Sequence, residues 1–317
     1  MIARRYPIIA GPTASGKTAL AIALAQAIDG EVVSADSMQV YADVSIGTAR
    51  PNENEMRDIP HHLMGFLPLD SVYSVARYQE DATVAFEDIY RRNKTPIMCG
   101  GTGLYIQSFM ENRQLFDEQP DPVLRQGYLK MAAQDGNQAL WDRLYACDPI
   151  TAERLHVNDL HRIIRALEVY DTTGKTISQQ AELSHTVPSP YEPCLFVLDF
   201  RDRQRLYDRI NKRVTLMLED GLLVEAERVL STNPDATVTQ AIGYKEFQAY
   251  FDGNCTLEEA ADRLRQQTRR YAKRQLSWFR RMVPQNTVYV DDYNTTDDLA
   301  NAVINTYTKF LRGEDTV

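Results

Sequence analysis

The chain has 317 residues, of which 44% are hydrophobic and 25% are charged, ordinary values for a soluble globular protein of one or two domains. Its 35 Lys and Arg residues against 44 Asp and Glu residues give a net charge of −9, which excludes nucleic-acid binding through a uniformly basic surface. Residues 1–10 lack the pattern of a signal peptide, and the longest nearly apolar stretch, residues 19–28, is about half a membrane span. We therefore expect a cytoplasmic protein with no membrane partner.

Strands and helices alternate in the first hundred residues. Residues 6–10 predict a short apolar strand, followed by a glycine-rich turn and a helix over residues 18–28. Residues 31–35 predict a second strand and residues 96–99 a third, with a helix that begins after Ser74 between them. This alternation predicts an α/β fold with a parallel β-sheet flanked by helices, because parallel strands need crossover connections.

The alternation then gives way to helices alone. Residues 121–184 carry only helical signals, including starts at Asp121 and Asp148, each followed by proline. A proline-rich linker leads to a strand over residues 195–198, and further helices run to residue 282. We therefore expect an α/β core interrupted by an all-helical insertion domain. The predicted boundaries are 1–116 for the first part of the core, 117–190 for the insertion and 191–317 for the second part of the core.

The most specific motif lies between the first strand and the first helix. It has the pattern GxxxxGK[ST] of a P-loop, in which glycines let backbone N–H groups surround an anion at a helix N-terminus. Lys17 would add a full positive charge, and Thr18 a hydroxyl that can bind Mg²⁺. The motif predicts a P-loop NTPase-like core that binds a di- or triphosphate, without indicating which one. It consists of Gly11, Pro12, Thr13, Ala14, Ser15, Gly16, Lys17 and Thr18.

Polar residues follow the second and third strands. Asp36 comes directly after the second strand, at the edge of a parallel sheet where ligands bind. A carboxylate there can bind Mg²⁺ through water or accept a proton from a nucleophile, but an Asx-turn or a helix cap explains it equally well. Thr102, in the turn Gly100–Gly103 after the third strand, offers a hydroxyl beside amides that could contact phosphate. On its own this turn is weak evidence, because Gly-Gly is common after a strand.

Three further groups have both functional and structural interpretations. Asp199 ends the strand 195–198, like the Mg²⁺-linked aspartate of P-loop NTPases, but we favour an exposed acid that caps the helix beginning near Arg203. His61 and His62 lack a third ligand at metal spacing and are better explained as polar loop residues. The four cysteines are far apart and form no CxxC pair, so we expect reduced thiols rather than a zinc site.

A basic segment contrasts with the acidic average of the chain. From Arg263 to Arg281 there are eight basic residues and no acidic one. Arg263, Arg270, Arg274 and Arg281 lie on one face of the predicted helix. A row of arginines of this kind suits a nucleic-acid backbone. A solvated charged face explains the same composition equally well.

Taken together, these motifs resemble the bacterial type of the tRNA dimethylallyltransferase family, also called the tRNA isopentenyltransferases. The matching pieces run in order from residue 11 to about residue 281. After the P-loop they are Asp36-Ser37-Met38-Gln39-Val40-Tyr41, Ile46-Gly47-Thr48-Ala49-Arg50-Pro51, His61-His62-Leu63, Gly100-Gly101-Thr102-Gly103-Leu104-Tyr105, Arg162-Ile163-Ile164-Arg165-Ala166-Leu167-Glu168, Ala241-Ile242-Gly243-Tyr244-Lys245-Glu246 and Thr268-Arg269-Arg270-Tyr271-Ala272-Lys273-Arg274-Gln275.

The resemblance implies a reaction and its catalytic residues. A dimethylallyl group would pass from dimethylallyl diphosphate to N6 of adenosine 37, beside the tRNA anticodon. The P-loop would hold the diphosphate leaving group, with Mg²⁺ as cofactor at Thr18. Asp36 would accept the proton from the N6 amine, while Lys17 and Thr102 would stabilise the charge that develops on the diphosphate.

The resemblance also implies a tRNA-binding surface, in which the insertion binds the anticodon stem and the target base is extruded towards the donor. It suggests a monomer with no obligate protein partner. With two arginines of the basic segment included, the expected tRNA contacts are Asp36, Ser37, Met38, Gln39, Thr102, Arg125, His161, Arg162, Ile163, Ile164, Arg165, Gln240, Ala241, Ile242, Gly243, Tyr244, Lys245, Arg270 and Arg274.

Three other functions share parts of these motifs. A small-molecule kinase would use the P-loop and Mg²⁺ on ATP, with Asp36 activating an acceptor hydroxyl. An adenylate isopentenyltransferase would prenylate a free nucleotide, and would need neither residues 162–168 nor the basic segment. A non-enzymatic nucleic-acid-binding protein would use phosphate only as a switch.

Overall fold

The structure is a computed structural model that describes residues 4–115, 121–184, 187–232, 236–283 and 285–314. The chain divides into two compact units, which we call the core unit (Met1–Met110 and Pro190–Val317) and the helical unit (Glu111–Ser189). This division falls six residues before the first predicted boundary (110 against 116) and one residue before the second (189 against 190).

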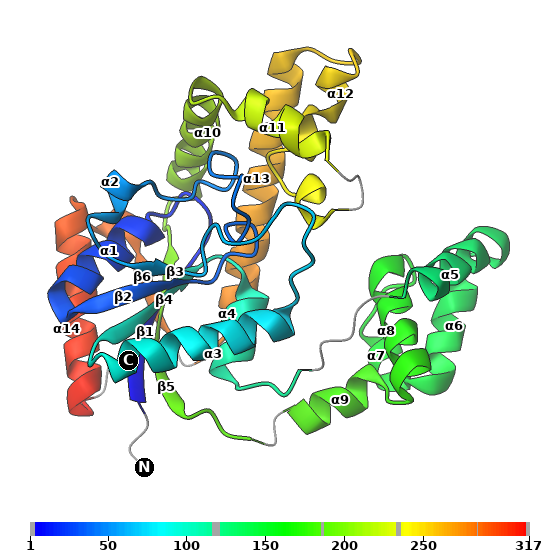
Figure 1. The fold of residues 1–317 in the computed structure, drawn as a ribbon, viewed down its shortest axis with the longest axis horizontal. Coiled ribbons are helices and arrows are strands. Elements are labelled where there is room, and N and C mark those ends of the chain that lie inside the picture. Colours follow the sequence, from blue (N-terminus) through cyan, green and yellow to red (C-terminus); the bar gives the residue numbers. More distant parts are fainter. Residues whose placement is uncertain (1–3, 116–120, 185–186, 233–235, 284, 315–317) are drawn as a thin grey trace. The chain divides into compact units, whose positions relative to one another are not determined.

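The core unit contains a six-stranded parallel sheet, as the α/β prediction required, in the order β3-β2-β4-β1-β5-β6 (Figure 1). The strands are β1 (Arg4–Ala10), β2 (Gly30–Ser34), β3 (His61–His62), β4 (Thr95–Gly100), β5 (Tyr191–Asp199) and β6 (Asn286–Tyr289). The sequence did not predict the edge strands β3 and β6. The expectation that His61 and His62 lie in a loop was wrong, because they pair with Val32 and Val33 of β2. A two-residue strand is too short to show any periodicity.

Helices cover both faces of the sheet. Ile8 and Ala10 of β1 belong to one buried cluster and Ile9 to another, because successive side chains of a strand point to opposite faces. The first cluster is completed by α3 (Val75–Arg91) and α4 (Gly103–Met110), and the second by α1 (Lys17–Ile28) and α14 (Thr296–Arg312) (Figure 1).

The segment after β5 forms a further helical layer of the core unit. Leu264 and Tyr244 from this layer share a buried cluster with Val40, from the segment that follows β2. The longest helix starts with a capping box formed by Thr256 and Glu259. The elements are α10 (Arg203–Glu219), α11 (Leu222–Leu230), η1 (Thr237–Gln240), η2 (Lys245–Phe247), α12 (Gln248–Phe251) and α13 (Leu257–Phe279), with the short α2 (Glu53–Met56) and η3 (Val290–Asp292) elsewhere in the unit.

The helical unit consists of α5 (Pro122–Asp135), α6 (Asn137–Cys147), α7 (Pro149–Glu153), α8 (Leu160–Thr173) and α9 (Ile177–Ser184). Asp121 caps α5 and Asp148 caps α7 through their side chains, which confirms both predicted helix starts. Leu140, Leu144 and Ile163 are fully buried at the centre of this unit.

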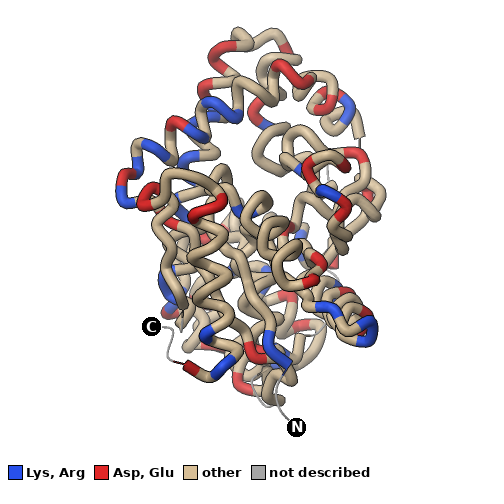
Figure 2. The backbone as a smooth tube through the Cα atoms, turned by 90° about the vertical axis from the view of Figure 1, so that its left-hand side faces the viewer, with Lys and Arg blue, Asp and Glu red and all other residues tan. Residues whose placement is uncertain are grey.

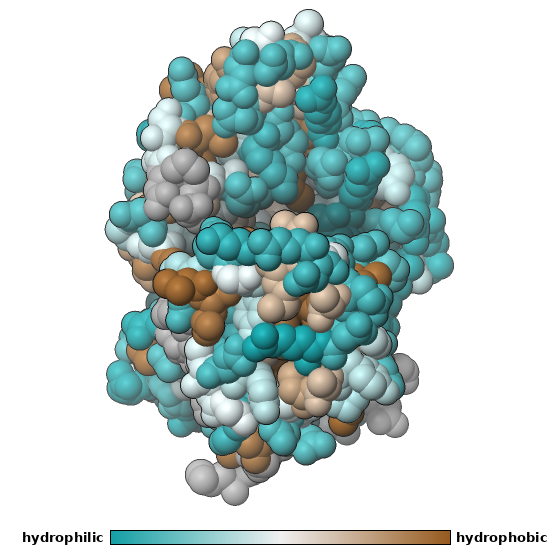
Figure 3. Space-filling view, turned by 90° about the vertical axis from the view of Figure 1, so that its right-hand side faces the viewer, coloured by the Kyte–Doolittle hydropathy of each residue, from teal (hydrophilic) through white to brown (hydrophobic). Residues whose placement is uncertain are grey.

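The surface is mixed in charge and mostly hydrophilic. Lys and Arg positions lie among Asp and Glu positions along the backbone in Figure 2, and Figure 3 shows apolar residues only in small, scattered groups on the face that it presents. Among the helices described, none is both long and apolar enough to cross a membrane.

Candidate active site

The glycine-rich turn between β1 and α1 has a backbone that requires glycine at two positions. Gly11 has a φ of +149°, and a Cβ there would lie 2.9 Å from the carbonyl oxygen of Leu198 in β5. Gly16 has a φ of +95° and occupies the N-cap of α1, where no side chain caps the helix. The first N–H groups of α1, including that of Thr18, are therefore suited to bind an anion at the positive end of the helix dipole.

Lys17 begins α1 and reaches back over this turn. Its Nζ donates a hydrogen bond to the carbonyl oxygen of Pro12 at 2.7 Å. Burial lowers the pKa of Lys17 to about 8; the charges of Cys99 and Asp36 oppose this shift, and the charge of Arg213 adds to it. An anion bound here would raise the pKa again, so the ammonium group is suited to hold a diphosphate.

Arg213 of α10 is a second cation of this site, and the sequence did not reveal it. Burial lowers its pKa, while the carboxylates of Asp36 and Glu55 oppose that shift. Arg213 forms no hydrogen bond or ion pair with any residue that the structure describes. Its helix lies against the turn, because Arg209 donates a hydrogen bond to the carbonyl oxygen of Ala14 at 2.8 Å. No motif surrounds Arg213, so only the packing of α10 identifies it.

Asp36 follows β2 and lies close enough to both cations for its charge to act on the pKa of Lys17 and of Arg213. Its Oδ1 accepts a hydrogen bond from the N–H of Met38 at 3.0 Å. This is the Asx-turn that was the structural alternative for Asp36. The two interpretations are compatible, because the turn holds the carboxylate in place on the side of the site where the cations lie.

The turn after β4 lies directly beside Asp36. The N–H of Thr102 donates to the carbonyl oxygen of Ala35 at 3.0 Å, and its Oγ1 accepts the N–H of Ser37 at 2.9 Å. Gly100 is required for this close approach, because a Cβ would lie 2.2 Å from the carbonyl oxygen of Ala35. Asp36 and Thr102, predicted from separate motifs, therefore meet at the carboxyl edge of the sheet.

Gln275 of α13 joins two of these turns. Its Oε1 accepts the N–H of Thr13 at 2.9 Å, and its Nε2 donates to the carbonyl oxygen of Gly101 at 2.9 Å. One buried amide thus holds the glycine-rich turn between β1 and α1 against the turn after β4. Gln275 belongs to one of the motifs matched in the sequence, but no feature of that motif indicated this role.

Asp199 is neither exposed nor a helix cap, so the structural interpretation favoured from the sequence was wrong in both respects. The residue is 3% exposed, and Asp202 caps α10 instead. Oδ1 of Asp199 accepts the N–H of Phe200 at 2.8 Å, and Oδ2 accepts Nη2 of Arg280 at 2.7 Å. Because both oxygens are engaged within the protein, Asp36 is the acidic residue better suited to chemistry.

The histidines of β3 belong to a structural network. Nε2 of His62 lies 2.8 Å from Oε2 of the buried Glu31, which also binds the guanidinium of Arg92. Hydrogen bonds from Arg92 and His62 lower the pKa of Glu31 to about 2. Within the described part of the chain, no group of three or more His, Cys, Asp or Glu residues could hold a metal ion, and the four cysteines are free thiols.

Glu225 of α11 helps to connect residues 36–39 and 240–245, the two segments of the core unit for which the sequence implied tRNA contacts. Its carboxylate accepts the N–H groups of residues 45–47 and the hydroxyl of Tyr244, which lies in the second segment. Gln39, in the first segment, donates its Nε2 to the carbonyl oxygen of Thr48 at 3.2 Å. One loop and one buried carboxylate therefore connect the two segments.

The implied contacts of α8 divide into exposed and buried side chains. His161 and Arg162 are exposed at the start of the helix. Ile163 is fully buried and Ile164 is 3% exposed, both in the apolar core of the helical unit. The two isoleucines therefore anchor the helix, and the side chains available to a ligand are those of His161 and Arg162.

Arg125 and Arg165 surround a buried carboxylate. Glu168 is 1% exposed and accepts Nε and Nη2 of Arg125 at 2.8 and 2.9 Å. Arg165 lies 3.9 Å from the same carboxylate. Arg125 thus has a structural role in the helical unit that the sequence did not indicate.

The two arginines of the basic segment that are expected to contact tRNA remain available on α13. Arg270 and Arg274 are exposed, and within the described residues neither forms an ion pair. The guanidinium of Arg274 lies 5.6 Å from the centre of the Tyr271 ring. By contrast, Arg280 is paired with Asp199.

The chain is similar to known proteins over most of its length. Residues 39–282 match the family model for IPP transferase. The tRNA dimethylallyltransferase of Thermoanaerobacter sp. (strain X514) is 43% identical over 310 residues, covering 97% of each chain, and that of Enterococcus faecalis is 46% identical over 275 residues, covering 86% of this chain and 87% of its own.

Solved structures show the same similarity. The tRNA isopentenylpyrophosphate transferase of Bacillus halodurans is 39% identical, with a TM-score of 0.73 over 98% of this chain and 97% of its own. A eukaryotic dimethylallyltransferase, described as acting on tRNA, is 30% identical, with a TM-score of 0.83 over 99% of this chain and 81% of its own. The chain therefore belongs to the IPP transferase family, the family of the tRNA dimethylallyltransferases.

Proposed function

We propose that this protein transfers a dimethylallyl group from dimethylallyl diphosphate to N6 of adenosine 37 in tRNA. The observation that carries the proposal is the arrangement at the carboxyl edge of the sheet, where an anion-binding turn with Lys17 and Arg213 faces Asp36. A reaction that expels diphosphate and deprotonates an amine needs an anion site and a base side by side. The relatives that match nearly the whole chain are named for this transfer.

The diphosphate of the donor would occupy residues 11–18. Lys17 and Arg213 would stabilise the negative charge that grows on the leaving group. Mg²⁺ would suit this site, because Mg²⁺ is commonly held by one or two protein oxygens together with substrate phosphates. It would be held by the hydroxyl of Thr18 and the diphosphate, and would neutralise part of the charge of the leaving group.

Asp36 would act as the base. A bond forms between N6 and C1 of the prenyl group, the C1–O bond breaks, and its electron pair leaves with the diphosphate. The proton from N6 passes to the Asp36 carboxylate. The Asx-turn to Met38 and the hydrogen bond from Ser37 to Thr102 hold this carboxylate in place for the transfer.

The acceptor would be a base extruded from the anticodon loop, because a stacked adenine cannot reach the donor. Residues 36–39 and 240–245 would contact the tRNA from the core unit, and Arg270 and Arg274 would contact its backbone. In the helical unit, the exposed start of α8 would bind the anticodon stem. The protein would work in the cytoplasm.

The alternatives considered from the sequence have weaker support. A kinase or an adenylate isopentenyltransferase would use the same anion site, but neither needs the helical unit. The tRNA dimethylallyltransferase of Thermoanaerobacter sp. matches 97% of the chain, so the match extends well into residues 111–189.

The deciding experiment mixes purified protein, Mg²⁺ and dimethylallyl diphosphate with unmodified tRNA that carries adenosine 37. Nucleoside mass spectrometry should find one added dimethylallyl group in that tRNA and none in AMP, in ATP or in a tRNA with guanosine at position 37. Prenylated AMP or ATP would instead indicate an adenylate isopentenyltransferase. Consumption of ATP without any prenylated product would indicate a kinase.

A further inference from the structure

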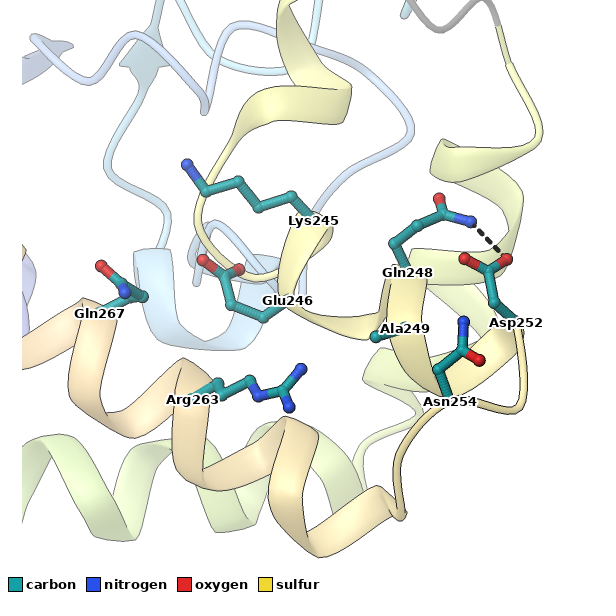
Figure 4. Close-up of a pocket in the computed structure, with 8 residues that line it drawn as sticks. All are labelled: Lys245, Glu246, Gln248, Ala249, Asp252, Asn254, Arg263 and Gln267. Carbon is teal, nitrogen blue, oxygen red and sulfur yellow. Dashed lines mark hydrogen bonds between the residues drawn. The ribbon is translucent and has the colours of Figure 1, made fainter.

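A second concave site lies in the core unit beside η2, α12 and the first half of α13 (Figure 4). It is an open pocket of about 490 Å³, within the range of roughly 300–1,000 Å³ that small ligands occupy. The side chains that matter for its chemistry are Lys245, Glu246, Gln248, Asp252, Arg263 and Gln267.

Glu246 presents an unused acceptor to this pocket. The residue is 8% exposed, and its Oε2 accepts the N–H of Gly243 at 2.9 Å. Its Oε1 is buried and has no hydrogen-bond partner among the described residues. A buried carboxylate oxygen without a partner is costly, so the site is incomplete without a ligand that carries an N–H or O–H donor.

Cations and amides surround this acceptor. Lys245 and Arg263 line the pocket from different elements, and neither forms an ion pair or hydrogen bond with the residues described. The amide of Gln248 donates to Asp252 at 2.9 Å, whereas the amide of Gln267 projects from α13 (Figure 4). A negatively charged group on a ligand would pair with the cations, and a polar heterocyclic edge would bond to the acceptor and the amides. A nucleotide has both a phosphate and such a base edge.

The position of the pocket connects it to the anion site. Gln267 precedes Gln275 by eight residues on α13, which is about 12 Å along the helix axis. Gln275 contacts both turns of the anion site. Lys245 ends the segment 240–245 that the sequence implied for tRNA. A polynucleotide with one base at Asp36 could therefore place a neighbouring nucleotide here.

We propose that this pocket binds an unstacked nucleotide. A base N–H donates to Oε1 of Glu246, and the phosphate lies against Lys245 and Arg263. The inference rests on the proposed function in one respect: the nucleotide is part of the tRNA, in the anticodon loop, and is distinct from the acceptor adenosine 37.

The test measures the affinity of tRNA for the full-length protein, not its turnover. Glu246→Gln should weaken binding about tenfold, because the single amide oxygen would keep the N–H of Gly243 and the NH₂ donor would face the N–H of the base. Arg263→Gln should lower the slope of log K against log salt by about 0.7–0.9. Arg312→Gln, on α14, removes a similar charge outside the pocket and should change neither value. Matching thermal unfolding curves show that the variants fold, and Arg263→Gln still tests the pocket if Glu246→Gln does not fold.

An abasic scan identifies the nucleotide. Anticodon stem-loops that lack one base each are titrated with wild-type protein and with Glu246→Gln. The difference in affinity between the two proteins should vanish when the missing base is the one that binds Glu246, at a single position other than 37. An effect that persists at every position, or no effect of either variant, would overturn the proposal. Glu246-dependent binding of free AMP, GMP, CMP or UMP, with tRNA affinity unchanged, would overturn its tRNA part and assign the pocket to a free nucleotide. Prenyl transfer by the wild type is measured separately in the same preparation. A failure of the proposed function can therefore be told apart from a failure of the pocket proposal.

Discussion

At the scale of single residues, the polar atoms of the candidate active site are divided between structural hydrogen bonds and groups left for chemistry. One oxygen of Asp36 holds an Asx-turn, and the hydroxyl of Thr102 accepts the N–H of Ser37. Lys17 donates to the carbonyl oxygen of Pro12 while its charge faces Asp36 and Arg213. A substitution here therefore tests chemistry only if it preserves the local hydrogen bond.

Asp36→Asn should strongly slow prenyl transfer and change tRNA affinity little, because the asparagine side chain keeps the size and shape of the aspartate. The asparagine Oδ1 can still accept the N–H of Met38, but the amide cannot take a proton from N6. We expect kcat to fall by about 10²–10⁴, the usual contribution of a general base, in a single-turnover assay of prenylated tRNA. Asp36→Ala also removes the turn and should lose stability in addition. Near-normal turnover of Asp36→Asn would make Asp36 a purely structural residue.

The charge of Lys17 predicts how donor binding depends on pH. Its pKa of about 8 lies below the ordinary value because of burial, so the ammonium loses its proton as the pH rises through about 8. We expect kcat/KM for the donor to fall over that interval, by up to tenfold per pH unit. Arg213→Gln should move the midpoint upwards, because the charge of Arg213 lowers the pKa of Lys17.

Lys17→Arg provides the matched control for this pH profile. Arginine stays protonated throughout the range, so the decline above pH 8 should disappear even if the overall activity is lower. A decline that survives in Lys17→Arg would assign the titration to another group.

At the scale of elements, α13 organises several parts of the core unit. Gln275 holds the two turns of the anion site together, Leu264 is buried in the cluster shared with α10 and α11, and Arg263 lines the second pocket. Arg270 and Arg274 are exposed between these positions. One helix therefore connects the anion site to the surface expected to bind tRNA.

Charge reversal of Arg270 and Arg274 to Glu should weaken tRNA binding in a salt-dependent way. Each lost phosphate contact should lower the slope of log K against log salt by about 0.7–0.9, since fewer counterions are released on binding. Filter binding at several salt concentrations measures the slope. Reversal of Lys309 and Arg312 on α14 is the matched control, and an unchanged slope in the α13 variant would assign its arginines to solvent.

At the scale of the whole molecule, two units with separate cores are built from one chain. The helical unit is inserted between α4 and β5 of the core unit and has its own buried cluster. Its interior also contains an ion pair between Arg125 and Glu168. The stability of the two units should therefore respond separately to mutation.

Arg125→Ala tests this separation. It leaves the buried Glu168 with Arg165 at 3.9 Å as its nearest basic partner, so we expect the free energy of unfolding of the helical unit to fall by about 2–4 kcal/mol. Hydrogen exchange should accelerate in α5 and α8 but stay unchanged in β1 and β4. A uniform acceleration over both units would show that they unfold together. If the stability does not change and only tRNA affinity falls, Arg125 acts as a contact residue.

Much of the fold could be read from local patterns. Short apolar runs between helical segments predicted β1, β2, β4 and β5, because a buried parallel strand is a continuous apolar run and its crossover helix has a helical period. The edge strands β3 and β6 were missed, because β3 has only two residues and β6 is only partly buried and is not an apolar run. The prediction that Asp199 is exposed was wrong, because its carboxylate is paired with Arg280. That residue lies 81 positions away in the chain, so no local pattern indicates the pair.

By itself, the sequence determined the family and located the glycine-rich turn and the acidic residue after β2, because each of these rests on residues that are consecutive in the chain. Only the tertiary structure decided the partners that these residues meet. Arg213, Gln275 and Glu225 come from helices far along the chain, and Glu246 becomes an unused acceptor only once it is buried. Such contacts depend on how helices and strands pack, and packing depends on the shape of every side chain between them. These contacts therefore leave no local pattern in the sequence.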